Sequence, residues 1–386
     1  MPFYRALSRG AKSGDPFPHP IAVPDRKRIA EGLLRLRRQF RSDQVPPRSL
    51  NQTLLLATWN IREFDNGGKF DARLPESLFY IAEIVSHFDI VAVQEVRADL
   101  TSLNRVMSLL GPWWKYIVTD VTYGKRGNQE RMAFVYDSRK VTFSGLAGEI
   151  VISPEEIEKK KLQFARTPFV CGFKAHWVRC NICTIHAYYG TSKPDDPKRL
   201  QEVENLAGIL KKYIAGPPVK PAKGKKSKED ARRPRQGENV IALGDFNIFT
   251  QNDKTLKALT AAGFHVPPEL MKRKGSNLDQ SKFYDQIAFL PVENRFGTTG
   301  KAGVFDFYQS VFRPEDEAQY AAMMSAKTAK AYRSKTGKAR SAYYKQWKTF
   351  QMSDHLVLWA ELQIDFGERY LQEAVGARSA PQKGGA

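Results

Sequence analysis

Short apolar runs alternate with turn signals and with helical patterns through most of this chain. The apolar runs predict strands at 53–59, 89–94, 115–119, 131–137, 168–176, 181–186, 239–244, 284–290 and 355–363. Apolar side chains at i, i+3 and i+4 spacing predict helices at 74–87, 99–110 and 197–214. Many strands with a few long helices between them favour two sheets packed face to face with helices outside.

Segments outside this pattern divide the chain further. Residues 1–50 form an N-terminal extension with a helix predicted at 25–41, where apolar residues keep helical spacing, arginines occupy the other faces and Asp25 is the expected N-cap. Residues 51–366 form one domain, and its basic insertions lie at about 213–238 and 313–349. The first insertion has the composition of a flexible loop, and the second begins Pro-Glu-Asp-Glu like a helix N-terminus. Residues 367–386 are predicted to be a flexible tail.

Composition narrows the class of protein. The 386 residues are 42% hydrophobic, which is enough for a sizeable core, and no run approaches the roughly 20 apolar residues of a membrane span. Arg5, Arg9 and Lys12 stand where a signal peptide needs an apolar run. Three cysteines are an odd number and too few for a disulfide scaffold. We therefore expect a cytoplasmic protein.

The net charge of +20 is concentrated in three places: residues 1–50, 211–238 and 313–349. A neutral body with basic attachments favours a polyanionic partner, either nucleic acid or an anionic membrane surface, over a role in solubility alone. In the third segment Tyr332, Tyr343, Tyr344 and Trp347 are interleaved with Lys and Arg. These aromatic side chains either stack on bases or anchor a helix on the body, and the sequence leaves both open.

Polar side chains stand at the ends of the predicted strands. A strand buries its middle and presents its end at the rim of a sheet, so these residues are expected to line one pocket. Carboxylate and carboxamide oxygens suit Mg²⁺, Mn²⁺ or Ca²⁺, and two histidines beside such a metal suit acid–base hydrolysis of a phosphate ester. The polar strand ends are Asn60, Glu95, His186, Asp245, Asn247, Asp285, Asp354 and His355.

The strings TWNI, QEV, IH, GDFN, YDQI and SDH, in that order, resemble the endonuclease/exonuclease/phosphatase superfamily. Arg62 after TWNI, Arg97 after QEV, Gln129-Glu130-Arg131 and Arg166 before Thr-Pro-Phe-Val are most similar to its deoxyribonuclease I-like branch. The resemblance covers about residues 52–363 apart from the insertions. It implies an α/β (α+β) four-layer sandwich with two mostly antiparallel sheets flanked by helices.

The resemblance also implies roles. Glu95, Asn60 and Asp354 would bind the divalent metal, with Mg²⁺ expected first and Mn²⁺ or Ca²⁺ as alternatives. Arg62, Arg97 and Arg166 would contact backbone phosphates. The catalytic set would be His186 and His355 as the acid–base pair, Glu130 and Asp285 as the carboxylates that orient them, and Asp245 and Asn247 on the other side of the pocket.

Two departures from the branch bear on substrate. The secreted relatives have disulfides and a signal peptide, and we expect neither from this sequence; Asn128 stands where deoxyribonuclease I has a tyrosine that enters the minor groove. We hypothesise that the insertion at 313–349 borders the cleft and replaces that contact. Deleting 316–346 is then expected to weaken substrate binding and its salt dependence.

The leading hypothesis is a metal-dependent phosphodiesterase acting on nucleic acid, specifically a DNA endonuclease. The alternative keeps the chemistry and takes phospholipid head groups as substrate, in the manner of sphingomyelinases or phosphoinositide phosphatases, with the arginine-faced helix at 25–41 lying on a membrane. A third hypothesis, a non-catalytic nucleic-acid-binding protein, is disfavoured because no histidine or carboxylate of the motif set is missing. The sequence indicates no protein partner.

Overall fold

The computed structural model describes residues 2–8, 16–64, 70–123, 127–158, 163–215, 238–291 and 296–376. Its strands form a six-stranded sheet in the order β10-β11-β1-β2-β4-β3 and a five-stranded sheet in the order β5-β6-β7-β8-β9. All neighbours pair antiparallel except β1 with β2 and β7 with β8, which are parallel. The first sheet contains β1 (Thr53–Phe64), β2 (Ile90–Arg97), β3 (Trp114–Val118), β4 (Glu130–Asp137), β10 (Thr298–Phe305) and β11 (Val357–Gln363). The second contains β5 (Thr142–Glu149), β6 (Phe169–Ala175), β7 (Val178–His186), β8 (Asn239–Asp245) and β9 (Asp285–Leu290).

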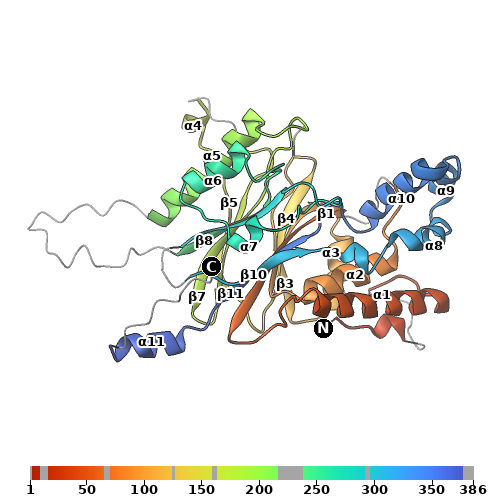
Figure 1. Cartoon of the computed structure of the whole chain (residues 1–386), viewed down its shortest axis with the longest axis horizontal. Coiled ribbons are helices and arrows are strands. Elements are labelled where there is room, and N and C mark those ends of the chain that lie inside the picture. Colours follow the sequence, from red (N-terminus) through yellow and green to blue (C-terminus); the bar gives the residue numbers. More distant parts are fainter. Residues whose placement is uncertain are drawn as a thin grey trace, which may run out of the picture.

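The two sheets pack face to face, and helices cover both outer faces (Figure 1). On the first sheet lie α1 (Val23–Ser42), α2 (Pro75–Ser86) and α3 (Thr101–Leu110). On the second lie α5 (Pro197–Ala215) and α6 (Lys254–Ala261), while α4 (Pro154–Glu158) and α7 (Pro268–Met271) are short connectors. The fold is the four-layer α/β sandwich with mostly antiparallel sheets that the sequence predicts.

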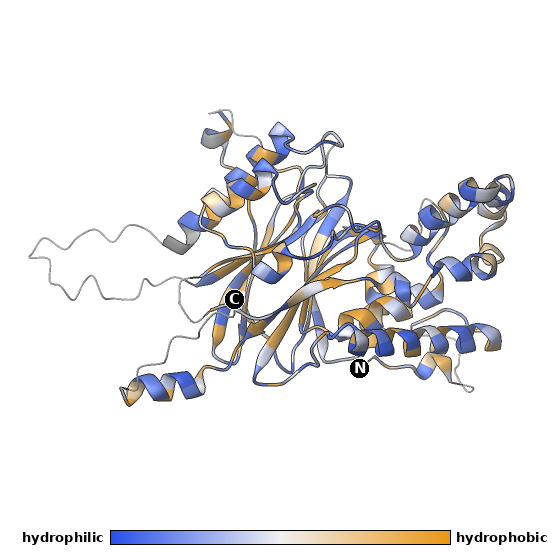
Figure 2. Cartoon of the chain, in the orientation of Figure 1, coloured by the Kyte–Doolittle hydropathy of each residue, from blue (hydrophilic) through white to orange (hydrophobic). Residues whose placement is uncertain are grey.

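Alternate residues of β1 show how one apolar run serves two cores. Leu54 and Leu56 pack between the sheets, whereas Leu55, Ala57 and Trp59 pack beneath the helices. A strand that is covered on both faces needs apolar residues at every position, which explains the unbroken run in TLLLATW. Figure 2 shows this pattern as orange along the inner strands and bluer outer faces on the helices.

All nine predicted strands and the three predicted helices of the body are present, and the sequence reading missed β5, β10 and α6. β5 and β10 are the outermost strands of their sheets, and most of their side chains are exposed or half-buried. Each also contains glycines. An edge strand that buries little has no strong alternation to reveal it.

The N-terminal helix begins two residues before the predicted 25–41 and ends one residue after it. Its N-cap is Ala22 rather than Asp25, because Pro24 is accommodated in the first turn and Asp25 lies inside the helix. The apolar face, which includes Ile29 and Leu36, is buried in the core under the first sheet. That face is therefore not available to lie on a membrane.

The insertion at 313–349 is not one helix. It forms a 3₁₀ turn and α8 (Glu317–Ala321), α9 (Ala326–Arg333) and α10 (Gly337–Gln351), with Ser325 capping α9 and Gly337 at φ +49° opening α10. Tyr344 and Trp347 are buried in the core beneath the first sheet. For these two aromatic residues the anchoring alternative is correct.

Two predicted flexible segments differ in outcome. Residues 216–237 of the basic loop lie outside the described residues, whereas the predicted tail begins with α11 (Gly367–Ala374). This helix was not predicted, and in it Tyr370 packs against Trp177 with ring centroids 5.8 Å apart. The three cysteines are free and buried. None of the helices in the described part of the chain has the length and apolarity required to cross a membrane.

Candidate active site

Strand register places the predicted polar residues in one row. On the second sheet His186 pairs with Asp245 across β7 and β8, and Asp245 pairs with Asp285 across β8 and β9. On the first sheet Asn60 pairs with Gln94, directly before Glu95. Because β1, β2, β7 and β8 all end at this edge, side chains from both sheets converge on one cleft.

Three residues at this edge have positive φ angles. Glu95 has φ +61° and Asn247 has φ +52°, conformations that non-glycine residues seldom adopt. Gly244 has φ +129°, and a Cβ at that position would meet the Ile185 carbonyl oxygen at 2.2 Å. Strained backbone concentrated where strands end is typical of functional sites, because the surrounding structure holds each side chain in a fixed direction.

The converging residues line a cleft of about 730 Å³. Ten of the twelve predicted site residues line it, and the remaining two, Asn60 and Asp285, lie fully buried behind it. The predicted residues in the lining are Arg62, Glu95, Arg97, Glu130, Arg166, His186, Asp245, Asn247, Asp354 and His355.

His186 is held by Glu130. The Nδ1 atom of His186 lies 2.9 Å from Oε2 of Glu130. The same carboxylate accepts a 2.7 Å hydrogen bond from Nε of Arg166, and Nη1 of Arg97 lies 3.6 Å away. Burial by itself would raise the pKa of Glu130, but His186 and Arg166 outweigh it and lower the pKa to about 2.

His355 is held by Asp285. Its Nδ1 atom lies 2.9 Å from Oδ2 of Asp285, whose side chain is fully buried. Burial lowers the pKa of His355, but the carboxylates of Asp285 and Asp245 more than reverse this and raise it well above the usual value. The surrounding carboxylates therefore favour the protonated form of the His355 imidazole.

Asp245 lies between the two imidazoles. Its Oδ2 atom is 3.5 Å from Nε2 of His186 and 3.7 Å from Nε2 of His355. Asn60 donates to the same oxygen at 3.1 Å, and the backbone N–H of Asn247 donates to Oδ1 at 2.9 Å. Both Nε2 atoms thus approach one carboxylate, and both Nδ1 atoms lie 2.9 Å from a carboxylate behind them, although only that of His355 has hydrogen-bond geometry.

The donor set fits a hard divalent cation. Asn60 donates to Glu95 at 3.0 Å, yet its own Oδ1 is buried without a hydrogen-bond partner in the described part of the chain. Burial, together with the charges of Glu130 and Asp354, raises the pKa of Glu95, so its carboxylate lacks sufficient positive charge nearby. The unpartnered amide oxygen of Asn60 and the carboxylate of Glu95 are suitable ligands for Mg²⁺, Mn²⁺ or Ca²⁺. A cation bound there would supply the missing positive charge. Two further groupings with metal-ligand spacing occur here, namely Glu95 with Glu130 and His186, and Asp245 with Asp285 and His355.

The three predicted phosphate-binding arginines are not equivalent. The side chains of Arg62 and Arg97 are 26% and 27% exposed, and that of Arg166 is 9% exposed. Nη1 of Arg62 lies 3.4 Å from Asp354, so this guanidinium is fixed at the cleft rim. Arg166 directs both of its recorded hydrogen bonds to Glu130 and acts as a support for that carboxylate.

The sequence reading missed three contributors. Tyr189 and Tyr284 form an aromatic side of the cleft, with the Tyr284 ring centroid 5.5 Å from that of His355. Ser353 is buried, and its Oγ accepts from the backbone N–H of His355 at 2.9 Å and donates to the Asn60 carbonyl at 2.6 Å. Ser353 and Tyr284 are the first residues of the SDH and YDQI strings, so a signal was present; nothing in the sequence marks Tyr189.

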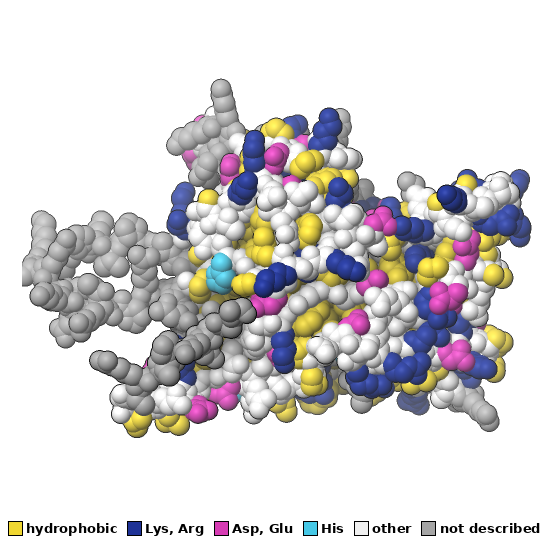
Figure 3. All heavy atoms as spheres, in the orientation of Figure 1, with side chains coloured by type: hydrophobic (Ala, Val, Ile, Leu, Met, Phe, Trp, Pro, Cys, Tyr) yellow, Lys and Arg dark blue, Asp and Glu magenta, His cyan; other side chains and the backbone are white. Residues whose placement is uncertain are grey.

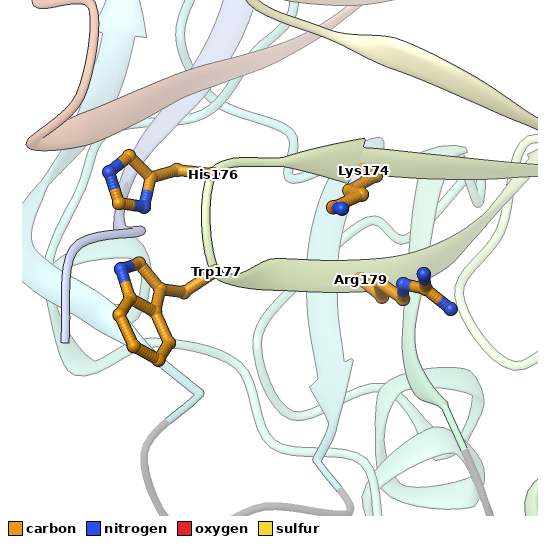
Figure 4. A pocket seen from close by; sticks show the side chains of 4 residues that line it. All are labelled: Lys174, His176, Trp177 and Arg179. Carbon is orange, nitrogen blue, oxygen red and sulfur yellow. The ribbon is translucent and has the colours of Figure 1, made fainter. Parts of the chain in front are cut away.

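A second hollow of about 570 Å³ lies at the other end of β7 (Figure 4). Its lining residues are Lys174 and Arg179 on neighbouring strands and His176 and Trp177 at the turn between them. β7 has nine residues, so this hollow is roughly 25–30 Å from His186. It contains no carboxylate and does not belong to the candidate active site.

Comparison with known protein families gives one match, and comparison with curated proteins gives none. A family model described as the Endonuclease/Exonuclease/phosphatase family matches residues 57–304.

Solved structures of similar fold include three named proteins. A Bacteroides thetaiotaomicron endonuclease/exonuclease/phosphatase family protein is 18% identical, with 82% of this chain and 99% of that chain covered and a TM-score of 0.47. The catalytic domain of human nocturnin with a bound sulfate anion is 12% identical, with 80% and 94% covered and a TM-score of 0.46. D. rerio TDP2 complexed with a single-strand DNA product is 10% identical, with 80% and 98% covered and a TM-score of 0.46. Because the family model spans well over half of its residues, the chain belongs to the endonuclease/exonuclease/phosphatase family, whose members are hydrolases of phosphoester bonds that use divalent metals.

Proposed function

We propose that this protein is a metal-dependent phosphodiesterase that hydrolyses the nucleic-acid backbone, and specifically a DNA endonuclease. The observation that carries the proposal is the pair of imidazoles whose Nε2 atoms lie 3.5 Å and 3.7 Å from the same carboxylate of Asp245. Each imidazole has its own carboxylate behind it, at 2.9 Å in both cases. A phosphodiester entering between the two Nε2 atoms has a proton donor and a proton acceptor on opposite sides.

The raised pKa of His355 supports its assignment as the proton donor. A protonated His355 presents Nε2–H to the phosphate, where it neutralises developing negative charge and protonates the leaving oxygen. His186 and Asp245 then orient the attacking water and take its proton. The P–O bond to water forms as the P–O bond to the leaving group breaks, so the reaction is a one-step hydrolysis.

Glu95 and Asn60, with Asp354 at the rim, are the residues that would hold the divalent cation. When bound there, the cation supplies positive charge that neutralises a phosphate oxygen. Asn247 contributes rigidity, because its Nδ2 donates to the Ala187 carbonyl at 2.8 Å while its backbone N–H fixes Asp245.

Charge supports nucleic acid as the substrate class. The protein carries a net charge of +20, and two partly exposed arginines stand at the cleft rim. A chain of phosphates gains from every cation along its path, whereas a single head group gains from few. The lipid alternative loses its main support, since the apolar face of α1 is buried.

The test is a nicking assay on supercoiled plasmid with Mg²⁺ or Mn²⁺, with EDTA and the His186→Ala variant as controls. We expect the wild-type protein to convert supercoiled plasmid to open circles, and we expect chelation or the substitution to abolish this. If a folded wild-type protein leaves the plasmid intact in both metals, duplex DNA is not the substrate. Single-stranded DNA, RNA and phospholipid vesicles tested under the same conditions then identify which phosphodiester is cleaved.

A further inference from the structure

The segment that separates α8 from the SDH motif has an unusual charge composition. Residues 318–353 contain eight Lys and Arg side chains and no Asp or Glu. Most of this segment forms α9 and α10, which we call the α9–α10 arm (residues 326–351). In Figure 1 the arm projects beyond the two sheets, and Figure 3 shows dark-blue side chains gathered over its outer end.

Four cations of the arm lack partners. Lys327, Lys330, Arg333 and Lys338 are exposed and have no hydrogen bond, ion pair or ring contact within the described residues. On α1, by contrast, Arg28 and Arg37 are bonded to the buried carboxylates of Glu76 and Glu83. The cations of α1 largely fasten a helix to the body. Lys345 of the arm is paired with Asp279, but the four unpartnered cations carry positive charge that no contact in the described structure neutralises.

The arm is firmly attached on its other side. Asp71 accepts hydrogen bonds from Thr328 Oγ1 at 2.7 Å and from Nε1 of Trp347 at 3.2 Å, and so ties α9 and α10 to the loop after β1. Tyr344 and Trp347 are buried among the aromatic residues under the first sheet. A rigid support means that the cations keep a fixed position relative to the body.

The C-terminal end of α10 lies at the rim of the cleft. Arg62 donates to Thr349 Oγ1 at 2.6 Å, and its guanidinium lies over the ring of Phe350, 3.9 Å from the centroid. The same guanidinium lies 3.4 Å from Asp354 at the rim. α10 has 15 residues, so its first turn lies roughly 20 Å from the end that meets the cleft.

We propose that the α9–α10 arm is a docking surface for the phosphate backbone of the substrate, beyond the phosphate that is cleaved. This inference rests on the proposed function. Because base pairs are 3.4 Å apart along a duplex, the first turn of α10 is about six base pairs from the cleavage point. The arm contacts phosphates and not base edges, so it increases affinity without selecting a sequence.

A nucleic acid fits this surface better than a lipid membrane does. None of the large hydrophobic side chains that are exposed in the described structure belongs to the arm. Interfacial membrane binding requires apolar side chains that enter the bilayer beside the cations. Among the aromatic residues of the arm, Tyr344, Trp347 and Phe350 are buried and Tyr332 and Tyr343 are half-buried, so none of them is free to enter a bilayer.

The test replaces the unpartnered cations without removing the buried aromatic residues, which a deletion of 316–346 would take away. The arm variant carries Lys327→Gln, Lys330→Gln, Arg333→Gln and Lys338→Gln. A control variant with the same loss of charge carries Lys27→Gln, Arg38→Gln, Arg41→Gln and Lys257→Gln, all at exposed positions on α1 and α6. Thermal unfolding confirms that both variants are folded.

Binding of a 30-base-pair duplex is measured at several salt concentrations, with His186→Ala added to every protein to prevent cleavage. We expect the arm variant to bind roughly tenfold to a hundredfold more weakly near 0.1 M salt, and the slope of log Kd against log salt to fall by about 3 to 4. The control variant should keep most of the slope. A hairpin with a five-base-pair stem, which is too short to reach the four substituted cations, should bind both variants equally.

Hydrolysis of bis(p-nitrophenyl) phosphate separates the two proposals. The small diester is expected to be cleaved equally by the arm variant and the wild-type protein, each with His186 intact. An unchanged salt slope in the arm variant, with this hydrolysis present, overturns the docking surface and leaves the proposed function standing. Loss of binding to phosphatidylserine vesicles without loss of duplex binding also overturns it. A wild-type protein that cleaves neither the diester nor nucleic acid overturns the proposed function itself.

Discussion

The candidate active site contains two pairs of an imidazole and a carboxylate, His186 with Glu130 and His355 with Asp285. The charges around the two carboxylates differ. Glu130 behind His186 is also bonded by Arg166 at 2.7 Å, and Arg97 lies 3.6 Å away. Asp285 behind His355 is fully buried, and its Oδ1 has no hydrogen-bond partner in the described part of the chain. The nearest guanidinium, that of Arg273, bonds only the backbone oxygen of Asp285, at 2.6 Å.

The difference gives the two imidazoles different electrostatic surroundings. Glu130 faces guanidiniums as well as an imidazole, whereas the carboxylate of Asp285 is bonded to the imidazole of His355. The pKa of His355 is accordingly raised well above its usual value in spite of burial. Neighbouring carboxylates, not the histidine itself, raise the pKa of His355.

The largest expected effect on kcat is that of removing either imidazole. His355→Gln and His186→Gln should each lower kcat by about 10²- to 10⁴-fold, because each deletes a group that moves a proton in the transition state. Steady-state hydrolysis of the small diester gives kcat, and the double variant shows whether the two act together. An additive double variant would indicate that the imidazoles do not serve one step.

Substitution of Asp285 or Glu130, the carboxylates behind the two imidazoles, tests whether the pairs differ. In Asp285→Asn the carboxylates of Asp245 and Asp354 still oppose the effect of burial, but the hydrogen-bonded carboxylate is gone, so the pKa of His355 should fall. Activity that needs protonated His355 is lost as the pH rises through that pKa, so the alkaline limb of the pH–rate profile should move to lower pH. We expect about a tenfold to hundredfold loss at pH 8, and much less at pH 6.

The matched variant on the other half is Glu130→Gln. It should reduce kcat without moving the alkaline limb, since Glu130 does not contact His355. A limb that moves equally in both variants would remove the assignment of His355 as the proton donor.

Arg166→Met should affect stability more than chemistry. Loss of Arg166 leaves the buried Glu130 carboxylate with fewer partners, and we expect unfolding to become easier by about 1–3 kcal/mol. The pKa of Glu130 is lowered from its usual value to about 2, so its contribution is present above its ordinary pKa and is lost as the pH falls toward 2. In the variant this loss should begin at higher pH, which thermal unfolding between pH 2 and pH 6 would detect. An unchanged acid profile would show that His186 alone sustains the charge of Glu130.

The smallest expected effect concerns Ser353. Ser353→Ala removes the hydroxyl that joins the backbone of His355 to that of Asn60, at a cost of about 1 kcal/mol in stability. The His186 half has no contact with this serine. Nuclear magnetic resonance of the two imidazoles should therefore show a shift at His355 and none at His186.

Much of this site could be predicted from the sequence because its residues follow strands that are easy to recognise. Asn60, His186 and Asp245 each close a fully apolar run, and parallel pairing of β1 with β2 and of β7 with β8 brings such ends to one edge. The metal preference also follows from the residue types alone. β5 and β10 were not predicted, because few of their side chains are buried and their sequences therefore do not alternate between apolar and polar residues.

Other features depended on contacts between distant segments. The aromatic residues of the basic insertion fit two readings in sequence, and only packing against the first sheet shows that Tyr344 and Trp347 are anchors. Arg166 looks like Arg62 in sequence, yet one supports a buried carboxylate and the other stands at the rim. Tyr189 had no signal, because its place in the cleft depends on where the chain turns after β7.

The sequence by itself determined the sandwich, the family and the residues that meet at the cleft, since local periodicity and residue chemistry are properties of short segments. Tertiary structure alone decided the surroundings of the charged groups: which carboxylate faces each imidazole, which arginine supports Glu130 and which cations of the arm face outward without a partner in the described part of the chain. Charge interactions depend on distance and burial, and those are set by residues that are 36 positions apart in Glu130 and Arg166 and 70 apart in Asp285 and His355.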